Sequence, residues 1–416
     1  MPTDPRKKPT RALPSKKKKR RKKSGFKRLL KRAGGLLNWY YAKTTDPEER
    51  ETRIKPKLLG RTVTYAGFMI MMVIAILLIT IILNNRSVGV EHEQIVVTGL
   101  PGDFEGYKIL VISDLNGRSF GQNQSTLMRR LSNETYNCVL ILGDMVGRNG
   151  NTDAFYALLD QLGTRKPIYF IAGDSDPAPI LQEPRDIEDQ ELTLSEMVLA
   201  DWVLGAIERG AIYLDTPQRV AKGTSAMWLM PDTVLNLNVT SALESYKDEL
   251  EQQNESYLEG ITRSRTTLPL TTYRRNQLFK TQSMISQVAT DDLICVLSHE
   301  VPSDSQLIVA QEALSAEEKK NQFAAPDLVF AGHYCGGEWK LPLIGTLYVQ
   351  SNILPRYGWF PDESYVQGQR SVGGTIVYTT QGLGNNPATI LGGRLNNPPR
   401  VAIVTLTGEL PASFLD

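Results

Sequence analysis

A stretch of 24 residues without a charged side chain, Thr62 to Asn85, most constrains how this 416-residue chain can fold. Arg61 and Arg86 flank the stretch, and its centre is a continuous apolar run from Phe68 to Ile79. A helix needs about 20 apolar residues to cross the hydrocarbon core of a bilayer. A buried helix of a soluble protein usually keeps a polar side, and this stretch has none. The sequence therefore predicts one transmembrane helix over residues 62–85.

A cleaved signal peptide is the alternative interpretation of the apolar stretch. The run is longer than the usual signal core, 61 residues precede it, and no small-x-small cleavage motif follows it. We therefore expect an uncleaved membrane anchor.

The charges of the chain divide at the same point. Residues 1–61 hold 22 Lys and Arg against 5 Asp and Glu, whereas the remainder holds 25 against 40. Because Lys- and Arg-rich flanks stay on the cytoplasmic side, the N-terminus is predicted to be cytoplasmic and residues 87–416 to be extracytoplasmic. The chain is thus expected to be a single-pass protein of the cell membrane.

The basic arm, residues 1–61, includes an unbroken run of cations from Lys16 to Lys23. Such a run can signal topology, bind anionic lipid head groups, or bind nucleic acid. Because a membrane span follows soon after, the first two interpretations take precedence and nucleic acid is disfavoured. Apolar and aromatic residues among cations at 26–41 suit an interfacial helix. A solvated tail without a binding role stays open as the alternative.

Short apolar runs of strand length recur after the membrane segment. They lie at 107–113, 137–142, 167–172, 293–297 and 328–331. Runs that are apolar throughout favour strands covered on both faces. Apolar residues at helical spacing predict helices at 123–133 and 152–162, between the first three runs. Alternation of strand and helix predicts an α/β fold.

The remaining segments complete the expected organisation of the outer part. Residues 375–379 and 400–406 alternate in polarity and predict antiparallel strands of a second sheet. Residues near 222–290 predict a peripheral helical insertion, because a Glu- and Gln-rich segment there has a helical period. We expect a stalk and first strand at 86–106, followed by one folded domain at 107–416.

Each of the five buried runs ends in a polar turn that contains carboxylates or histidines. The turns are Ser113–Gly117, Gly143–Asp144, Gly173–Asp176, Ser298–Glu300 and Gly332–Gly337. In open α/β sheets ligands bind outside the carboxyl ends of strands, so we expect the five turns to converge on one rim. Carboxylates and imidazoles are suitable donors for borderline divalent metals. Two of the three histidines of the chain, His299 and His333, occupy these turns.

The order and content of these turns resemble the calcineurin-like metallophosphoesterases, most nearly their membrane-associated bacterial branch. That family carries the blocks Asp-x-His, Gly-Asp, Gly-Asn-His, a single His and Gly-His-x-His after successive strands. The resemblance covers residues 92–416. It implies an α/β, metallo-dependent phosphatase-like four-layer sandwich, in which two mixed β-sheets are flanked by helices. One transmembrane helix would precede this sandwich.

The resemblance also implies a dinuclear metal site in which Asp144 takes the place of the bridging carboxylate. His299, His333 and Asp174 would complete one metal site, with Asp174 standing where the family usually has Asn. The additional negative charge of Asp174 should strengthen cation binding and repel an anionic phosphate.

The second metal site implied by the resemblance departs further from the family. Asp114 matches, whereas Asn116 and Cys335 stand where histidines are usual. Asn116 should weaken this site, and a Cys335 thiolate would favour zinc over manganese. Ser175 replaces the family histidine that contacts the phosphate and assists the leaving group, and loss of a general acid costs roughly 100- to 10,000-fold in rate. We expect a divalent ion, which could be zinc, manganese or iron, with one ion favoured over two.

Two functions follow from the resemblance and its departures. The first is a membrane-anchored, metal-dependent hydrolase of a phosphoester substrate, with a degenerate dinuclear site and weak or altered activity. The alternative is a catalytically inactive domain of the same fold that binds or scaffolds at the cell surface. Taken singly, Asp114 and Asp144 could be turn formers, and His299 could be a structural histidine. The remaining cysteines, Cys138 and Cys295, lie within strand runs and are expected in the core.

Overall fold

The computed structural model describes residues 56–185, 194–258, 268–312, 326–349, 358–385 and 393–408. The interpretations placed on residues 1–55 lie outside the described residues. The chain divides into two compact units, Met1–Leu77 and Leu78–Asp416, and the folded domain belongs to the second.

The charge-free stretch lies within one long helix, α2 (Pro56–Arg86). Its segment Tyr65–Arg86 has a mean hydropathy of 3.0, and no part of that segment is buried. Large apolar side chains such as Phe68 (65% exposed) and Ile70 (60% exposed) face outward. A helix of this length and composition is able to cross a membrane.

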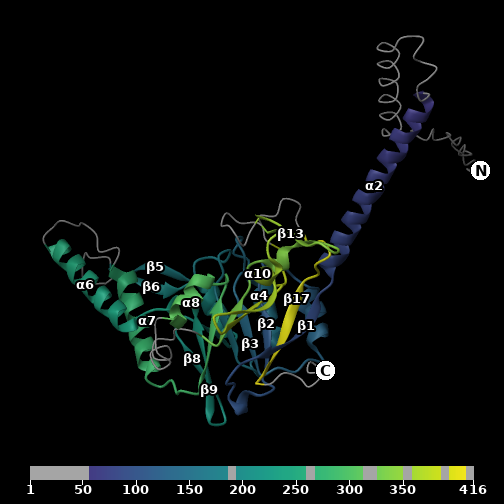
Figure 1. The fold of residues 1–416 in the computed structure, drawn as a ribbon. Helices are drawn as coiled ribbons and strands as arrows, with labels where there is room; N and C mark the ends of the chain where they lie inside the picture. Colours follow the sequence, from purple (N-terminus) through teal and green to yellow (C-terminus); the bar gives the residue numbers. More distant parts are fainter. Residues whose placement is uncertain are drawn as a thin grey trace, which may run out of the picture. The chain divides into compact units, whose positions relative to one another are not determined.

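Two six-stranded sheets form the folded domain (Figure 1). The first sheet consists, in spatial order, of β1 (Gly89–Val96), β17 (Arg400–Thr407), β2 (Lys108–Ile112), β3 (Cys138–Leu142), β4 (Ile168–Ile171) and β7 (Ala211–Tyr213). The second consists of β15 (Gly368–Val372), β16 (Thr375–Thr379), β11 (Leu328–Ala331), β10 (Leu293–Ser298), β9 (Ser225–Pro231) and β8 (Gln218–Lys222). Both sheets are mixed, because β17 is antiparallel to β2 while β8 and β15 are antiparallel to their neighbours.

Helices and two small sheets surround the large sheets. The helices are α3 (Ser125–Leu131), α4 (Asp153–Leu162), α5 (Asp201–Glu208), α6 (Val239–Leu258), α7 (Leu268–Ile285), α8 (Asp304–Glu312) and α10 (Glu363–Val366). Short 3₁₀ turns are η2 (Gly102–Phe104), η3 (Gln122–Gln124), η4 (Asp232–Val234) and η5 (Cys335–Gly337). The small sheets pair β12 (Trp339–Leu341), β13 (Gly345–Val349) and β14 (Gly358–Trp359), and β5 (Ile180–Arg185) with β6 (Leu194–Leu199).

Side-chain alternation along the buried strands creates the four layers. On β2, Leu110 and Ile112 face helices α3, α4 and α5, where they join a cluster that includes Phe155. Ile109 and Val111 point the other way, into the cluster between the two sheets. A third cluster covers the outer face of the second sheet and includes buried residues of α8 and α10. The predicted sandwich of two mixed sheets flanked by helices is therefore confirmed.

Two cysteines and the third histidine of the chain lie away from the polar turns. Cys138 and Cys295 are fully buried in the cluster between the sheets, as expected. His92 lies on β1, where its exposed ring forms a hydrogen bond of 2.9 Å with the Glu134 carboxylate.

Two sequence-based expectations of sheet membership require correction. Residues 400–406 were expected in the second sheet, but β17 lies in the first, between β1 and β2. The five polar turns were expected at the rim of one open sheet, yet β10 and β11 belong to the second sheet. A polarity pattern reports which faces of a strand are buried and carries no information about its partners, so neither assignment was available from the pattern.

Candidate metal centre

The predicted metal ligands meet where the parallel strands of both sheets end. Asp114 and Asn116 follow β2, Asp144 follows β3, Asp174 follows β4, His299 follows β10, and His333 and Cys335 follow β11. Backbone hydrogen bonds tie the turns together in pairs. The Asn116 amide donates to the Asp144 carbonyl at 2.7 Å, and the Gly332 amide donates to the His299 carbonyl at 3.0 Å.

Two glycines allow the turns after β3 and β4 to touch. Gly143 has a φ of +86°, and a Cβ there would lie 2.6 Å from the amide nitrogen of Gly173. A Cβ on Gly173 would lie 2.2 Å from Oδ1 of Asp144. Such distances exclude any larger residue without movement of the backbone. The two glycines therefore place Asp144 beside the turn that carries Asp174.

The backbone is left-handed at five of the predicted metal ligands. The φ angles are 54° at Asp114, 49° at Asn116, 54° at Asp144, 73° at His333 and 50° at Cys335. Positive φ is uncommon for residues other than glycine, and it concentrates at functional sites where the surrounding structure maintains it. The repeated use of this conformation indicates that the fold holds these side chains in a defined arrangement.

His299 occupies the middle of the arrangement. Its ring is buried, and Nδ1 lies 2.7 Å from the Leu142 carbonyl, to which it must donate because a carbonyl can only accept. Nε2 therefore points into the site, 2.9 Å from Oδ1 of Asp174 and 3.4 Å from Oδ1 of Asp144. A backbone carbonyl that fixes the outer ring nitrogen is the usual support of a metal-binding histidine.

Two groups of potential ligands share His299. One consists of Asp174, His299 and His333, and the other of Asp114, Asp144 and His299, with the donor atoms of each group within 4.8 Å of one another. His333 completes the first group through Nδ1, which lies 3.3 Å from Nε2 of His299 and 3.4 Å from Oδ1 of Asp174. Five of the predicted residues are therefore brought together.

The titratable groups of the site perturb one another strongly. Burial raises the pKa of the Asp114 carboxyl above its ordinary value, and the negative charge of Asp144 adds to this effect. Hydrogen bonds from His299 and His333 hold the pKa of Asp174 well below its usual range. Burial lowers the pKa of His299, but its hydrogen bonds to Asp144 and Asp174 outweigh burial and raise that pKa overall. In the absence of a metal ion, protons thus balance the carboxylates, and a divalent cation could take their place.

Two buried oxygen atoms in this site are available to coordinate a metal ion. Oδ1 of Asp114 and Oδ1 of Asn116 accept no hydrogen bond from any residue in the described part of the chain. Buried polar atoms are normally paired, so such atoms require an explanation. Oxygen and imidazole donors together suit zinc, manganese and iron. The residues present therefore fit a divalent metal.

Cys335 and Ser175 lie at the site without joining either ligand group of the described residues. Cys335 is 1% exposed, and burial raises the pKa of its thiol well above the ordinary value. Ser175 is also buried, and its backbone amide donates to Oδ1 of Asp144 at 2.8 Å. The ligand role of Cys335 stays a prediction.

Two further aspartates, which were not among the predicted metal ligands, contribute to the site. The Asp176 carboxylate accepts hydrogen bonds from the amides of Val146, Gly147 and Gly173, and so joins the turns after β3 and β4. Asp232, after β9, accepts a hydrogen bond of 2.6 Å from the Ser298 hydroxyl. Desolvation by the surrounding protein raises the pKa of both carboxyls. Asp176 could have been found from its place two residues after Asp174, whereas Asp232 has no comparable signal.

Comparisons with known proteins identify the family of the chain. The calcineurin-like phosphoesterase family matches residues 107–336, which is more than half of the chain. A phosphopantetheinyl hydrolase of known structure from Mycobacterium tuberculosis shares 12% sequence identity, with a TM-score of 0.31 over 67% of this chain and 91% of that chain. No curated protein matches the chain. On the family match, the chain belongs to the calcineurin-like phosphoesterases.

Proposed function

We propose that this chain is a membrane-anchored, metal-dependent hydrolase of phosphoesters whose metal site is altered and whose turnover is slow. The observation that carries the proposal is the gathering of Asp114, Asp144, Asp174, His299 and His333 into two ligand groups that share His299, with the donor atoms of each group within 4.8 Å of one another. Phosphoesterases of this family use divalent metals, and the donor set of this chain suits such ions.

Different residues of the chain would hold the metal ions of the two sites. Asp174, His299 and His333 would hold one ion, with Asp144 beside them and the Leu142 carbonyl fixing the tautomer of His299. When bound, divalent metal ions neutralise charge on phosphoryl oxygens and lower the pKa of water in phosphoester hydrolysis. Asp114 and Asn116 offer the unpaired oxygens of a weaker second site.

Three substitutions support slow rather than full activity. Asn116 offers a neutral oxygen in place of an imidazole, and the buried Cys335 thiol resists ionisation because burial raises its pKa. The Ser175 hydroxyl cannot supply a proton near neutral pH as an imidazole does. Loss of this general acid lowers the rate of hydrolysis by roughly 100- to 10,000-fold. A fourth substitution acts in the same direction, because the exposed, ionised carboxylate of Asp174 would repel an anionic substrate.

The membrane part of the proposal rests on the segment Tyr65–Arg86, which is long and apolar enough to span a bilayer. The excess of cations in residues 1–61 favours a cytoplasmic N-terminus, an extracytoplasmic catalytic domain, and contact of the arm with anionic lipid head groups.

Hydrolysis of bis(p-nitrophenyl) phosphate by the full chain in detergent, with zinc or manganese added, tests the proposed function. We expect slow turnover that a chelator abolishes and that Asp144→Asn lowers at least tenfold. Restoring the three family histidines together, as Asn116→His, Ser175→His and Cys335→His, should raise turnover at least about 100-fold. Turnover that is insensitive to both chelator and Asp144→Asn would contradict the proposal.

The inactive binding module is the second candidate function, and the same three substitutions favour it. If the triple variant binds two metal ions by elemental analysis yet gains no hydrolysis, the pocket no longer admits a phosphoester in a reactive position. That outcome would replace the hydrolase by the binding module.

A further inference from the structure

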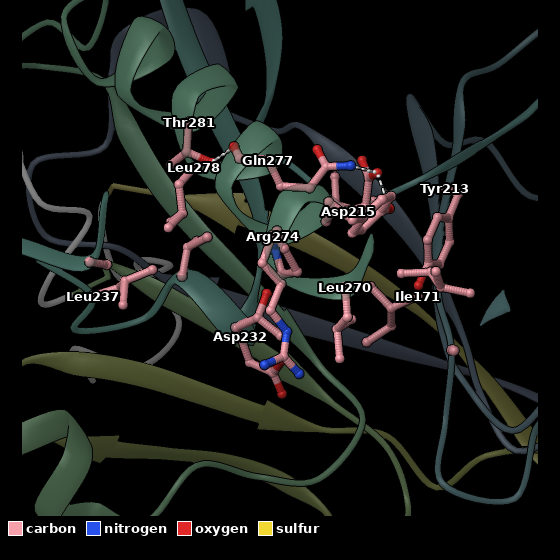
Figure 2. A pocket seen from close by; sticks show the side chains of 18 of the residues that line it. Ile171, Tyr213, Asp215, Asp232, Leu237, Leu270, Arg274, Gln277, Leu278 and Thr281 are labelled. Carbon is pink, nitrogen blue, oxygen red and sulfur yellow. Dashed lines mark hydrogen bonds between the residues drawn. The ribbon is translucent and has the colours of Figure 1, made fainter. Parts of the chain in front are cut away.

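A cavity of about 690 Å³ lies beside the candidate metal centre, since His299 is one of the residues that line it. Figure 2 shows the cavity from close by. One wall comes from the sandwich, at the ends of β4, β7 and β9, and the opposite wall comes from the inserted helices α6 and α7. Sites for small molecules usually enclose about 300–1,000 Å³. The size and position of this cavity therefore suit a ligand that also reaches the metal centre.

The cavity wall is predominantly apolar and aromatic. Its apolar and aromatic side chains include Ile171, Tyr213, Val234, Leu237, Leu270 and Leu278. A wall of this kind gains free energy by covering apolar ligand surface. The ligand it would take is consequently apolar over most of its surface.

One cationic side chain, Arg274 of α7, lines the cavity together with the carboxylates of Asp215 and Asp232, and Figure 2 shows these three side chains. Arg274 is exposed at its position on α7. A guanidinium group that lines a pocket pairs readily with a carboxylate or phosphate. Arg274 thus adds a preference for an anionic group on an otherwise apolar ligand.

The helical wall is fixed to the sandwich by a partly buried polar contact. The Asp215 carboxylate accepts hydrogen bonds from the Tyr273 hydroxyl at 3.0 Å and from the Gln277 amide at 2.7 Å, both on α7 (Figure 2). Desolvation raises the pKa of Tyr273 to about 12, so its hydroxyl stays a donor at neutral pH. A further hydrogen bond of 3.0 Å joins Thr271 of α7 to Glu249 of α6. The cavity is therefore part of the folded arrangement of both helices.

We propose that this cavity binds the alcohol portion of the phosphoester substrate, and that this portion is apolar and carries an anionic group for Arg274. The inference rests on the proposed function, because it requires a phosphoester to bind at the metal centre. His299 links the two places, since it lines the cavity and belongs to both ligand groups of the metal centre. A substrate seated with its phosphate at the metal centre would thereby extend its alcohol portion between the sandwich and helix α7.

Calorimetric titration of the full chain in lipid nanodiscs with three phosphonates tests this proposal. The probes are methylphosphonate, (2-naphthyl)methylphosphonate and the latter bearing a 6-carboxylate, none of which can be hydrolysed at its P–C bond. We expect the naphthyl probe to bind at least tenfold more tightly than methylphosphonate, and the carboxylate to improve affinity about threefold further.

Variants on one helix separate the cavity from the rest of the surface. Leu270→Gln should weaken both naphthyl probes at least fivefold and leave methylphosphonate unchanged. Arg274→Gln should remove only the gain from the carboxylate. Phe279→Gln and Lys280→Gln are the matched controls, since both side chains are exposed on α7 and neither lines the cavity.

The outcomes distinguish this proposal from the proposed function. Equal affinity for methylphosphonate and the naphthyl probe, or equal losses in Leu270→Gln and Phe279→Gln, would overturn the cavity proposal while leaving hydrolysis intact. Naphthyl binding that depends on Leu270 but survives chelation, together with an absence of metal-dependent turnover, would retain the cavity and reject the hydrolase. Failure of every probe to bind would also overturn the cavity proposal.

Discussion

At the residue scale, His299 connects the two ligand groups of the candidate metal centre. Its Nδ1 is committed to the Leu142 carbonyl, so only Nε2 is directed at Asp144 and Asp174. A residue with one nitrogen fixed in this way offers a single, oriented donor to a cation.

Replacing His299 should therefore weaken divalent metal binding. We expect His299→Gln to lower zinc affinity at least about tenfold, as loss of oriented metal ligands does. Competition titration against a chromophoric chelator measures this change. His92→Gln is the control, since His92 is exposed and belongs to neither ligand group. Unchanged zinc affinity in His299→Gln would contradict the placement of this residue in the site.

Asp103 provides a pH prediction away from the metal centre. Its carboxylate accepts a hydrogen bond of 2.8 Å from the Thr224 amide, in the turn between β8 and β9, and this bond is the main cause of its lowered pKa. A lowered folded-state pKa contributes stability above the unfolded value, which is about 3.9, and loses it as the pH falls through the folded value.

We accordingly expect Asp103→Asn to lower the free energy of unfolding at neutral pH. The difference from the native chain should disappear in acid, once the native carboxyl is protonated as well. Urea unfolding between neutral pH and acid measures this difference. Asp248→Asn, at an exposed position of α6, should leave the profile unchanged. A difference that persists undiminished in acid would exclude the carboxylate as its cause.

At the scale of elements, the sequence was most informative where strands are apolar throughout. The five apolar runs became β2, β3, β4, β10 and β11, because a strand buried on both faces leaves a continuous signal. Short elements such as β7, β12 and β14 were missed, since three or fewer residues carry no period. The cavity could not be predicted, because it depends on where α7 docks, and that position rests on contacts between distant segments, such as those of Tyr273 and Gln277 with Asp215.

The turn after β3 gives a prediction that couples backbone geometry to metal binding. Gly143→Ala would place a Cβ 2.6 Å from the Gly173 nitrogen in a left-handed conformation, so the turns that carry Asp144 and Asp174 must separate. We expect both a lower melting temperature and at least a tenfold loss of zinc affinity. Gly163→Ala is the control, because Gly163 is also left-handed and has open space around it. Equal zinc affinity in both variants would contradict the role assigned to Gly143.

Helix α4 gives a prediction about packing. Phe155 is fully buried against the first sheet, with its ring 5.9 Å from that of Phe170. Phe155→Ala should cost about 3–5 kcal/mol of unfolding free energy through lost burial and the cavity left behind. Gln161→Ala on the same helix is exposed, and surface substitutions of this kind usually stay within about 0.5 kcal/mol. Urea unfolding compares the two, and equal effects would show that α4 does not pack as described.

At the scale of the whole molecule, the family and the positions of the ligand-bearing turns could be predicted from the sequence. Both depend on local patterns, namely an apolar strand followed by a Gly-containing polar turn. The division of those turns between two sheets, and the support from Asp176 and Asp232, depend on contacts between distant segments. Local patterns do not contain such contacts.

The orientation of the chain gives a prediction at the same scale. With a peptide tag at each end of the full chain, the C-terminal tag should be labelled by antibody on intact cells, and the N-terminal tag only after permeabilisation. The reason is the excess of cations in residues 1–61. The reverse labelling would place the metal centre in the cytoplasm.

The turns after β2, β3, β4, β10 and β11 together should bind a divalent metal ion. Elemental analysis of the purified full chain tests this binding most directly. We predict one tightly held zinc, manganese or iron ion per chain, lost on substitution Asp144→Asn and retained on substitution of the exposed Asp160→Asn. A chain that folds normally yet holds no stoichiometric metal after incubation with each of these ions would contradict the account.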